Sequence, residues 1–184
     1  MSKKASDGRV SRLPPLPNPL PPETQELFDE RLKKMGRILN LHHVFGHAPK
    51  LSKASAAMAF GLRYETSVGR LWIEIAIVRA AQHAKGTYEE VQHKPMLLAE
   101  GYTEEKYKAL KRWRSSKLFD KKERALLAYT DEVCDYGKVK NATFAAMEKF
   151  FDAQQILELS FAIGTYYGTA LVMNALEIQL EKKK

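Results

Sequence analysis

Residues 67–99 read SVGRLWIEIAIVRAAQHAKGTYEEVQHKPMLLA, and this stretch decides the fold class. Its first half, through Lys85, is the most apolar part of the chain, and its apolar residues fit one long helix. Gly86 interrupts the pattern, and a second helix is predicted over Thr87–Ala99. Two successive helices with no alternating strand pattern between them indicate an all-α protein.

The rest of the chain extends this prediction to about seven or eight helices. Apolar residues recur at helical spacing from Leu27 to Leu39, and Gly46 and Pro49 mark a break over residues 40–49. Further helices are predicted over residues 51–62, 103–113, 120–137, 143–151 and 154–180. Asp120, Asn141 and Asp152 are the expected caps of the last three. No β-hairpin signature is found between strand-like runs.

Length and composition suit one globular domain with short arms. The chain has 184 residues, of which 45% are hydrophobic and 28% charged. Residues 1–22 contain six prolines and are predicted to be an extended basic arm, residues 23–180 the domain, and residues 181–184 a basic tail. The arm and the tail together hold five of the eight net positive charges. Cys134 has no second cysteine with which to form an internal disulfide.

The expected location is a reducing cytoplasm, with no membrane partner. Apolar runs are only a few residues long, whereas a bilayer-spanning helix needs roughly 20, and no secretory signal is visible. Residues 104–124 hold nine basic and four acidic side chains around Trp113. That segment could meet a nucleic acid, but a solvated helix face is the favoured interpretation. A positive rim that attracts small anions toward a pocket is a further one.

Two features carry candidate chemistry. Glu74 has only apolar neighbours, so it is either a buried acid with a raised pKa or an exposed or Arg70-paired carboxylate; the segment alone favours neither. Glu89 and His93 are four residues apart and share a helical face, as an acid–base pair or a metal site requires, but this spacing is common in plain surface pairs. The loop histidines His43 and His47 lack further ligands, so no metal is expected.

Taken together, these runs resemble the carboxymuconolactone decarboxylase and AhpD-like superfamily. Members have a helix with a central Glu, then a Tyr-Glu-Trp-x-x-His or Cys-x-x-Cys-x-x-x-His motif, then an Ala-x-Gly-hydrophobic-Thr turn. Residues 74–79, 86–93 and 99–105 are similar to these three parts, and residues 120–127 and 151–159 to later helices. The resemblance extends from about residue 12 over nearly the whole chain and implies an AhpD-like helical bundle.

Some residues depart from the family pattern, and these departures exclude some of the reactions known for the family. Gly86 and Glu89 stand where peroxidase members have their two cysteines, so disulfide-cycling peroxidase chemistry is not expected. Glu90 stands where the family usually has Trp, so the identity of the substrate does not carry over. What remains is Glu74, Glu89 and His93, the acid–base set of the decarboxylase branch.

The resemblance implies a lyase that works without a cofactor on a small anionic carbonyl or lactone compound, such as those of aromatic catabolism. His93 or Glu89 would protonate a dienolate left by loss of carbon dioxide, and Glu74 would hold or relay the proton. Retro-aldol cleavage, lactone hydrolysis and isomerisation need the same groups and stay open. A non-catalytic helical scaffold that kept the fold is the alternative of a different class. Buried, clustered positions for the three residues would favour the enzyme.

Other predicted features concern substrate binding and assembly. Candidate substrate-binding residues are His47, Tyr64, Arg70, Tyr88 and Tyr166. The last predicted helix is apolar around much of its circumference, so it needs a second covering surface, which a homo-oligomer would supply. The family resemblance implies a dimer, trimer or hexamer. Gly164 and Gly168 on this helix are expected to allow close helix packing.

Overall fold

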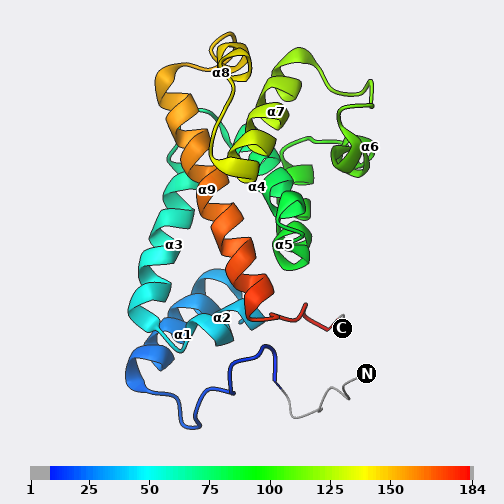
Figure 1. Cartoon of the computed structure of the whole chain (residues 1–184). Coiled ribbons are helices and arrows are strands. Elements are labelled where there is room, and N and C mark those ends of the chain that lie inside the picture. The colour runs from blue at the N-terminus through cyan, green and yellow to red at the C-terminus, as the bar shows by residue number, and fades with distance from the viewer. Residues whose placement is uncertain (1–8, 183–184) are drawn as a thin grey trace. The chain divides into compact units, whose positions relative to one another are not determined.

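The computed structural model describes residues 9–182, except for the side chain of Tyr136, and within this range the chain is helical with no strand. This confirms the predicted all-α class. The described residues form nine α-helices and one short 3-10 helix (Figure 1). They are α1 (Pro22–Met35), α2 (Asn40–Phe45), α3 (Pro49–Tyr64), α4 (Arg70–His83), α5 (Thr87–Ala99), α6 (Glu104–Ala109), η1 (Leu110–Arg112), α7 (Lys121–Tyr136), α8 (Asn141–Met147) and α9 (Ala153–Ala175).

Helices α2, α8 and α9 differ from their predicted course. The expected cap Asn141 is the first residue of α8, whose N-cap is Lys140, and α8 ends at Met147 instead of residue 151. Helix α2 lies in the segment that was predicted to be a break, because the imidazole Nδ1 of His42 accepts a hydrogen bond from the Leu39 backbone N–H at 3.1 Å and caps the helix. Helix α9 ends at Ala175, five residues before its predicted end. Glu177 takes a left-handed backbone conformation, with φ of 50°, which turns the chain out of the helix.

The chain divides into two compact units. The first comprises residues 1–59 and 173–184, and the second comprises residues 60–172. Residues 1–8 of the predicted arm and residues 183–184 of the predicted tail lie outside the described residues. The division into an arm, a domain over residues 23–180 and a tail stays a prediction.

The first unit is built around the proline-rich segment. Its backbone pairs with the chain that follows α9, where the Arg12 N–H donates to the Leu176 carbonyl at 2.8 Å. Gly46 allows a close approach at the end of α2, because a Cβ atom there would lie 2.8 Å from Leu16 Cδ1. This segment, α1 and α2 line an open cavity of about 470 Å³.

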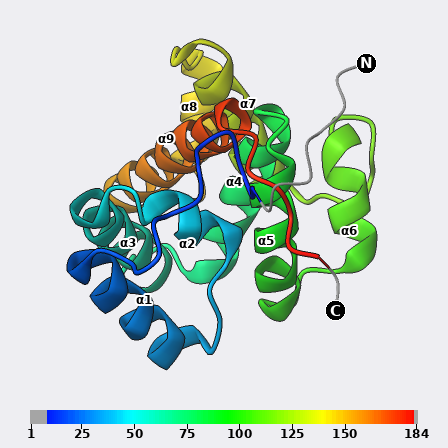
Figure 2. The same cartoon turned by 90° about the horizontal axis from the view of Figure 1, so that it is seen from below.

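Helix α4 is the core of the second unit. Its residues from Ile73 to Val78 are all fully buried, which explains why this part of its sequence is apolar on every side except at Glu74. It packs against α5 and α7, and the views in Figures 1 and 2 both place α5 beside it. At the start of α5, a Cβ atom on Gly86 would lie 2.7 Å from the Cβ of Ala170, so glycine lets α5 approach α9 closely.

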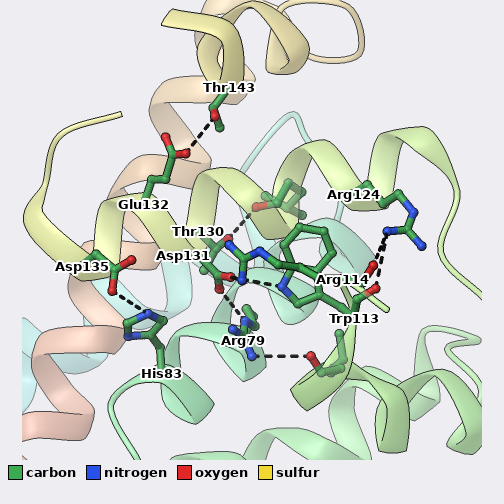
Figure 3. A network of polar contacts seen from close by, with 12 residues as sticks. Arg79, His83, Trp113, Arg114, Arg124, Thr130, Asp131, Glu132, Asp135 and Thr143 are labelled. Atoms are coloured by element: carbon green, nitrogen blue, oxygen red, sulfur yellow. Dashed lines mark hydrogen bonds and ion pairs between the residues drawn. The ribbon is translucent and has the colours of Figure 1, made fainter. Parts of the chain in front are cut away.

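A polar network around Asp131 holds α7 against α4 and the η1 segment (Figure 3). The buried Asp131 carboxylate accepts hydrogen bonds from Arg79 Nε and from Trp113 Nε1, the latter at 3.1 Å. It also pairs with Arg114 at 2.6 Å. Because a buried charge is costly unless it is paired, this carboxylate with its donors fixes the position of α4, which carries Glu74.

One face of α9 is apolar and exposed. Leu157, Phe161, Leu171 and Val172 lie on it, each at least 45% exposed. Gly164 and Gly168 lie between them, and no atom would contact a Cβ at either position, so these glycines do not serve the close packing within the chain that was predicted. Among residues 9–182, α9 alone has the length and hydropathy of a membrane span, with 39% of the tested window buried.

Candidate active site

Glu74 and His93 form a buried pair between α4 and α5. The side chain of Glu74 is 0% exposed, and its Oε2 lies 2.8 Å from the imidazole Nδ1 of His93. The two residues come from antiparallel neighbouring helices, so the tight turn after α4 determines this pairing. A carboxyl group that is fully buried requires a hydrogen-bonding partner, and the imidazole of His93 supplies one.

Glu89 lies on the other side of the same imidazole. Its Oε2 is 3.6 Å from His93 Nε2, a distance slightly longer than a hydrogen bond, and its side chain is buried. Burial raises the pKa of Glu89, and the nearby carboxylate of Glu74 acts in the same direction, whereas His93 and Arg63 act in the opposite one. The imidazole of His93 is thus held between two buried carboxyl groups with different surroundings.

Arg70 lies next to both the buried Glu74 and the partly exposed Glu100. Its Nε lies 3.5 Å from Glu74 Oε1 and 3.5 Å from Glu100 Oε1. Its guanidinium carbon is 4.5 Å from the centre of the Tyr64 ring, within the range of a cation–π contact. Glu74 is therefore both buried and paired with Arg70.

The two other predicted tyrosines are buried. The ring of Tyr166 on α9 meets the imidazole of His93 edge to face, with ring centres 5.0 Å apart. Burial raises the pKa of Tyr166 well above its ordinary value, so its hydroxyl stays protonated at neutral pH. Tyr88, next to Glu89 in sequence, is also buried.

His47 is the predicted site residue that the structure does not place with the others. It belongs to the first unit, where its Nε2 lies 3.0 Å from the carbonyl oxygen of Pro14 and its side chain lines the cavity described above. The remaining predicted residues all belong to the second unit.

Sequence reasoning missed three residues of this site. Arg63, Met96 and Glu100 carry no motif, but Met96 and Glu100 continue the spacing of Glu89 and His93 along α5, which places all four on one face of that helix. The Nη1 of Arg63 lies 3.6 Å from the Met96 sulfur. The helical spacing was a usable signal for the two α5 residues, whereas nothing local identified Arg63.

The basic segment from residue 104 to residue 124 is largely engaged in contacts within the chain. Lys106 pairs with Glu123 at 2.8 Å, Lys111 with Glu90 at 3.1 Å, and the Arg124 guanidinium donates to backbone carbonyls. The preference for a solvated helix face over a nucleic-acid site stays a prediction. Within the described part of the chain, no group of three or more His, Cys, Asp or Glu side chains is arranged as a metal site.

No protein-family model and no curated protein matches the sequence. Solved structures do match. An uncharacterised peroxidase-related protein from Silicibacter sp. TM1040 has a TM-score of 0.82 at 20% identity, over 98% of this chain and 95% of the other. The alkylhydroperoxidase AhpD core of a peroxidase-related protein from Ralstonia eutropha JMP134 has a TM-score of 0.80 at 18% identity, over 94% and 93%.

A third match is a cysteine-to-alanine variant of a debrominase in complex with 2,3,4-tribromopyrrole. Its TM-score is 0.74 at 15% identity, over 94% of this chain and 91% of the other. At these identities the matches show the fold, and the predicted AhpD-like fold is confirmed. Proteins with this fold include an enzyme.

Proposed function

We propose that this protein is a lyase that needs no cofactor and uses Glu89, His93 and Glu74 as an acid–base relay. The reaction is decarboxylation or C–C cleavage of a small anionic carbonyl or lactone compound. The observation that carries the proposal is the imidazole of His93 lying between two buried carboxyl groups, 2.8 Å from Glu74 and 3.6 Å from Glu89. A scaffold protein would have no use for two buried acids, because their burial costs free energy.

The surroundings of the two acids give them different roles. Because burial raises the pKa of Glu89, its carboxyl group can carry the proton to be transferred. His93 then donates its Nδ1 hydrogen to Glu74, which fixes the tautomer and leaves Nε2 facing Glu89. A short movement would close the 3.6 Å gap into a hydrogen bond.

In the decarboxylation, the bond between the carboxylate carbon and the adjacent carbon breaks and carbon dioxide leaves. The electron pair moves into the conjugated carbonyl and gives a dienolate. Glu89 or His93 protonates the dienolate carbon, and a proton from water restores the relay. Tyr64, Arg70, Tyr88 and Tyr166 are the proposed substrate contacts. No external oxidant is needed, because the electron pair moves within the substrate and only a proton is transferred to it.

Thiol chemistry is not proposed, although some proteins of this fold are described as peroxidase-related. The single cysteine, Cys134, is buried on α7, and burial raises its pKa to about 12. At neutral pH it stays a thiol, which is a poor nucleophile.

The test is turnover of 4-carboxymuconolactone, followed by ultraviolet absorbance and release of carbon dioxide. Wild type is compared with Glu74→Gln and His93→Ala. The matched control is His83→Ala, because His83 lies at the other end of α4 and pairs with Asp135 on α7. We expect turnover in wild type and the control, and its loss in the two site variants. Absence of turnover in wild type would overturn this reaction.

We further propose that the protein is a cytoplasmic homo-oligomer. The exposed apolar face of α9 supports this, because an exposed apolar patch on a helix of this length is normally covered. The open space beside Gly164 and Gly168 leaves room for side chains of a second copy.

A further inference from the structure

Arg70 lies midway between two carboxylates without a hydrogen bond to either. Its Nε is 3.5 Å from Glu74 Oε1 and the same 3.5 Å from Glu100 Oε1. Among the described residues, Arg70 Nε and Glu74 Oε1 are both buried polar atoms that make no hydrogen bond. Buried polar atoms are normally paired, so this is not the position that either ion pair alone would favour.

Arg70 and Glu100 both stand at helix ends that disfavour their charges. Arg70 is the first residue of α4, where the helix dipole is positive, and Glu100 follows the last residue of α5, where the dipole is negative. Each of the two therefore gains from the charge of the other. Glu100 is partly exposed, whereas Glu74 is fully buried, so the guanidinium has one partner in the interior and one that reaches water.

The guanidinium can approach either carboxylate by a small movement. A hydrogen bond between nitrogen and oxygen has a length of about 2.9 Å, so a shift of roughly half an ångström toward one acid would form it and weaken the contact with the other. The Tyr64 ring lies 4.5 Å from the guanidinium carbon, and a cation–π contact tolerates such a shift. Arg70 thus has two available positions over the same ring.

The charge on the imidazole of His93 decides which position is favoured. Glu74 presents its other oxygen, Oε2, to His93 Nδ1 at 2.8 Å. While the imidazole is neutral, Arg70 supplies the positive charge that the buried Glu74 carboxylate requires. When a proton passes from the Glu89 carboxyl group to Nε2, the imidazolium supplies that charge itself and repels Arg70. The carboxylate of Glu100 is then the better partner.

The other groups around the imidazole do not take over this part. Glu89 on α5 holds the proton to be transferred, and burial raises the pKa of Tyr166 on α9, so that its hydroxyl stays neutral. From α3, Arg63 acts through its charge on both of these residues, and the Tyr64 ring packs on Arg70. Arg70 is the cation that shares the Glu74 carboxylate with the imidazole.

We propose that Arg70 alternates between Glu74 and Glu100 as the neighbouring imidazole gains and loses its proton. Glu100 is thereby a positioning residue, which acts on His93 through Arg70. The inference rests on the proposed function, in which His93 takes the proton from Glu89 and passes it to the dienolate carbon. Only hydrogen bonds change partner in the alternation, and the proton gained at Nε2 is the one later lost to the substrate.

The position of Arg70 can be followed by NMR without any substrate. The Nε–H signal of Arg70 is identified by its loss in Arg70→Lys and is compared in wild type, Glu74→Gln and Glu100→Gln. The wild-type signal should lie between those of the two site variants, because each variant leaves one charged partner. The control Glu105→Gln removes an exposed carboxylate of the same unit and should match wild type. An unchanged signal in Glu100→Gln, which alters a partly exposed side chain and so should fold, would overturn the proposal.

The link to His93 is tested by a pH titration of wild type, in which the ring signals of His93 report its charge. As the imidazole is protonated, the Arg70 signal should move in step away from the value found in Glu100→Gln, where Glu74 alone holds the guanidinium. An Arg70 signal that does not follow the charge of His93 would overturn the alternation.

Turnover of 4-carboxymuconolactone gives the kinetic readout. Glu100→Gln should lower kcat by up to about a hundredfold while KM changes little, because the imidazolium becomes harder to form but the acid–base groups stay in place. An unchanged kcat would overturn the role of Glu100. If wild type does not turn over but the Arg70 signal follows His93, the lyase is refuted and the alternation stands. Turnover with an Arg70 signal independent of His93 leaves the lyase and overturns the alternation.

Discussion

The buried carboxyl group of Glu89 makes the stability of this protein depend on pH in a direction that can be tested. Its pKa in the folded state is raised above the ordinary value of 4.5. Below pH 4.5 the group is protonated in both the folded and the unfolded chain. Above that value the unfolded chain releases the proton while the folded chain keeps it. The folded state then loses about 1.4 kcal/mol of stability for each pH unit, until the folded pKa is reached.

The perturbation that isolates this effect is Glu89→Gln, which keeps the shape and cannot titrate. Its amide can still donate a hydrogen bond toward His93. We expect the free energy of unfolding of the variant, relative to wild type, to rise with pH through this window at up to about 1.4 kcal/mol per pH unit. The variant should also lose turnover, because it has no proton to transfer.

The assay is urea unfolding of both proteins at several values from about pH 4.5 to 8, where the linkage acts. Glu105→Gln, which removes an exposed carboxylate from α6, is the control for a change of one charge. Parallel stability curves for wild type and Glu89→Gln would refute the reasoning, because they would show that Glu89 titrates alike in the folded and unfolded states.

Three further predictions concern the helix packing around the site and the assembly of the protein. Asp131→Asn should lower the free energy of unfolding by about 3–5 kcal/mol in urea, because it leaves the Arg79 guanidinium buried without its counter-charge. Gly86→Ala should cost about 1–3 kcal/mol, because its Cβ would lie 2.7 Å from that of Ala170, and the double variant with Ala170→Gly should recover much of the loss. Phe161→Gln on the exposed face of α9 should lower the mass measured by light scattering if that face joins the subunits.

Each of these has a matched control. Asp135→Asn alters a half-exposed ion pair on the same helix and should cost much less than Asp131→Asn. Gly164→Ala adds a methyl group in open space and should not destabilise. Phe144→Gln removes an exposed ring from α8 and should leave the mass unchanged. Equal effects of a variant and its control would contradict the corresponding prediction.

The residues of the candidate site could be predicted from sequence only with the help of the family resemblance. Glu74 was an acid in an otherwise apolar helix, whereas the spacing of Glu89 and His93 is common and by itself indicated only a shared helical face. Their proximity to each other followed from the family resemblance. The helix boundaries over residues 87–99 and at Asp120 were also predictable, since a glycine break and a capping side chain determine them.

What could not be predicted depends on contacts between distant parts of the chain. Arg63 reaches the site from the last turn of α3 through its contact with Met96 on α5, and its own neighbours in sequence give no sign of this. Helix α2 was missed because a histidine side chain caps it, and histidine is not among the usual capping residues. The end of α9 was misplaced because the chain leaves the helix to pair with the Arg12 backbone, which an apolar pattern does not reveal.

The turn between α4 and α5 determines more than a change of direction. Glu74 and His93 meet across it, at 2.8 Å, from two helices joined by only three residues, Ala84, Lys85 and Gly86. Each residue of a helix advances the side-chain direction by about 100°. A one-residue insertion in this turn would rotate His93 away from Glu74 or force a rearrangement at Gly86, where no space is left. Length variants in these three positions should therefore be absent among functional homologues, even where the residues at positions 84 and 85 differ.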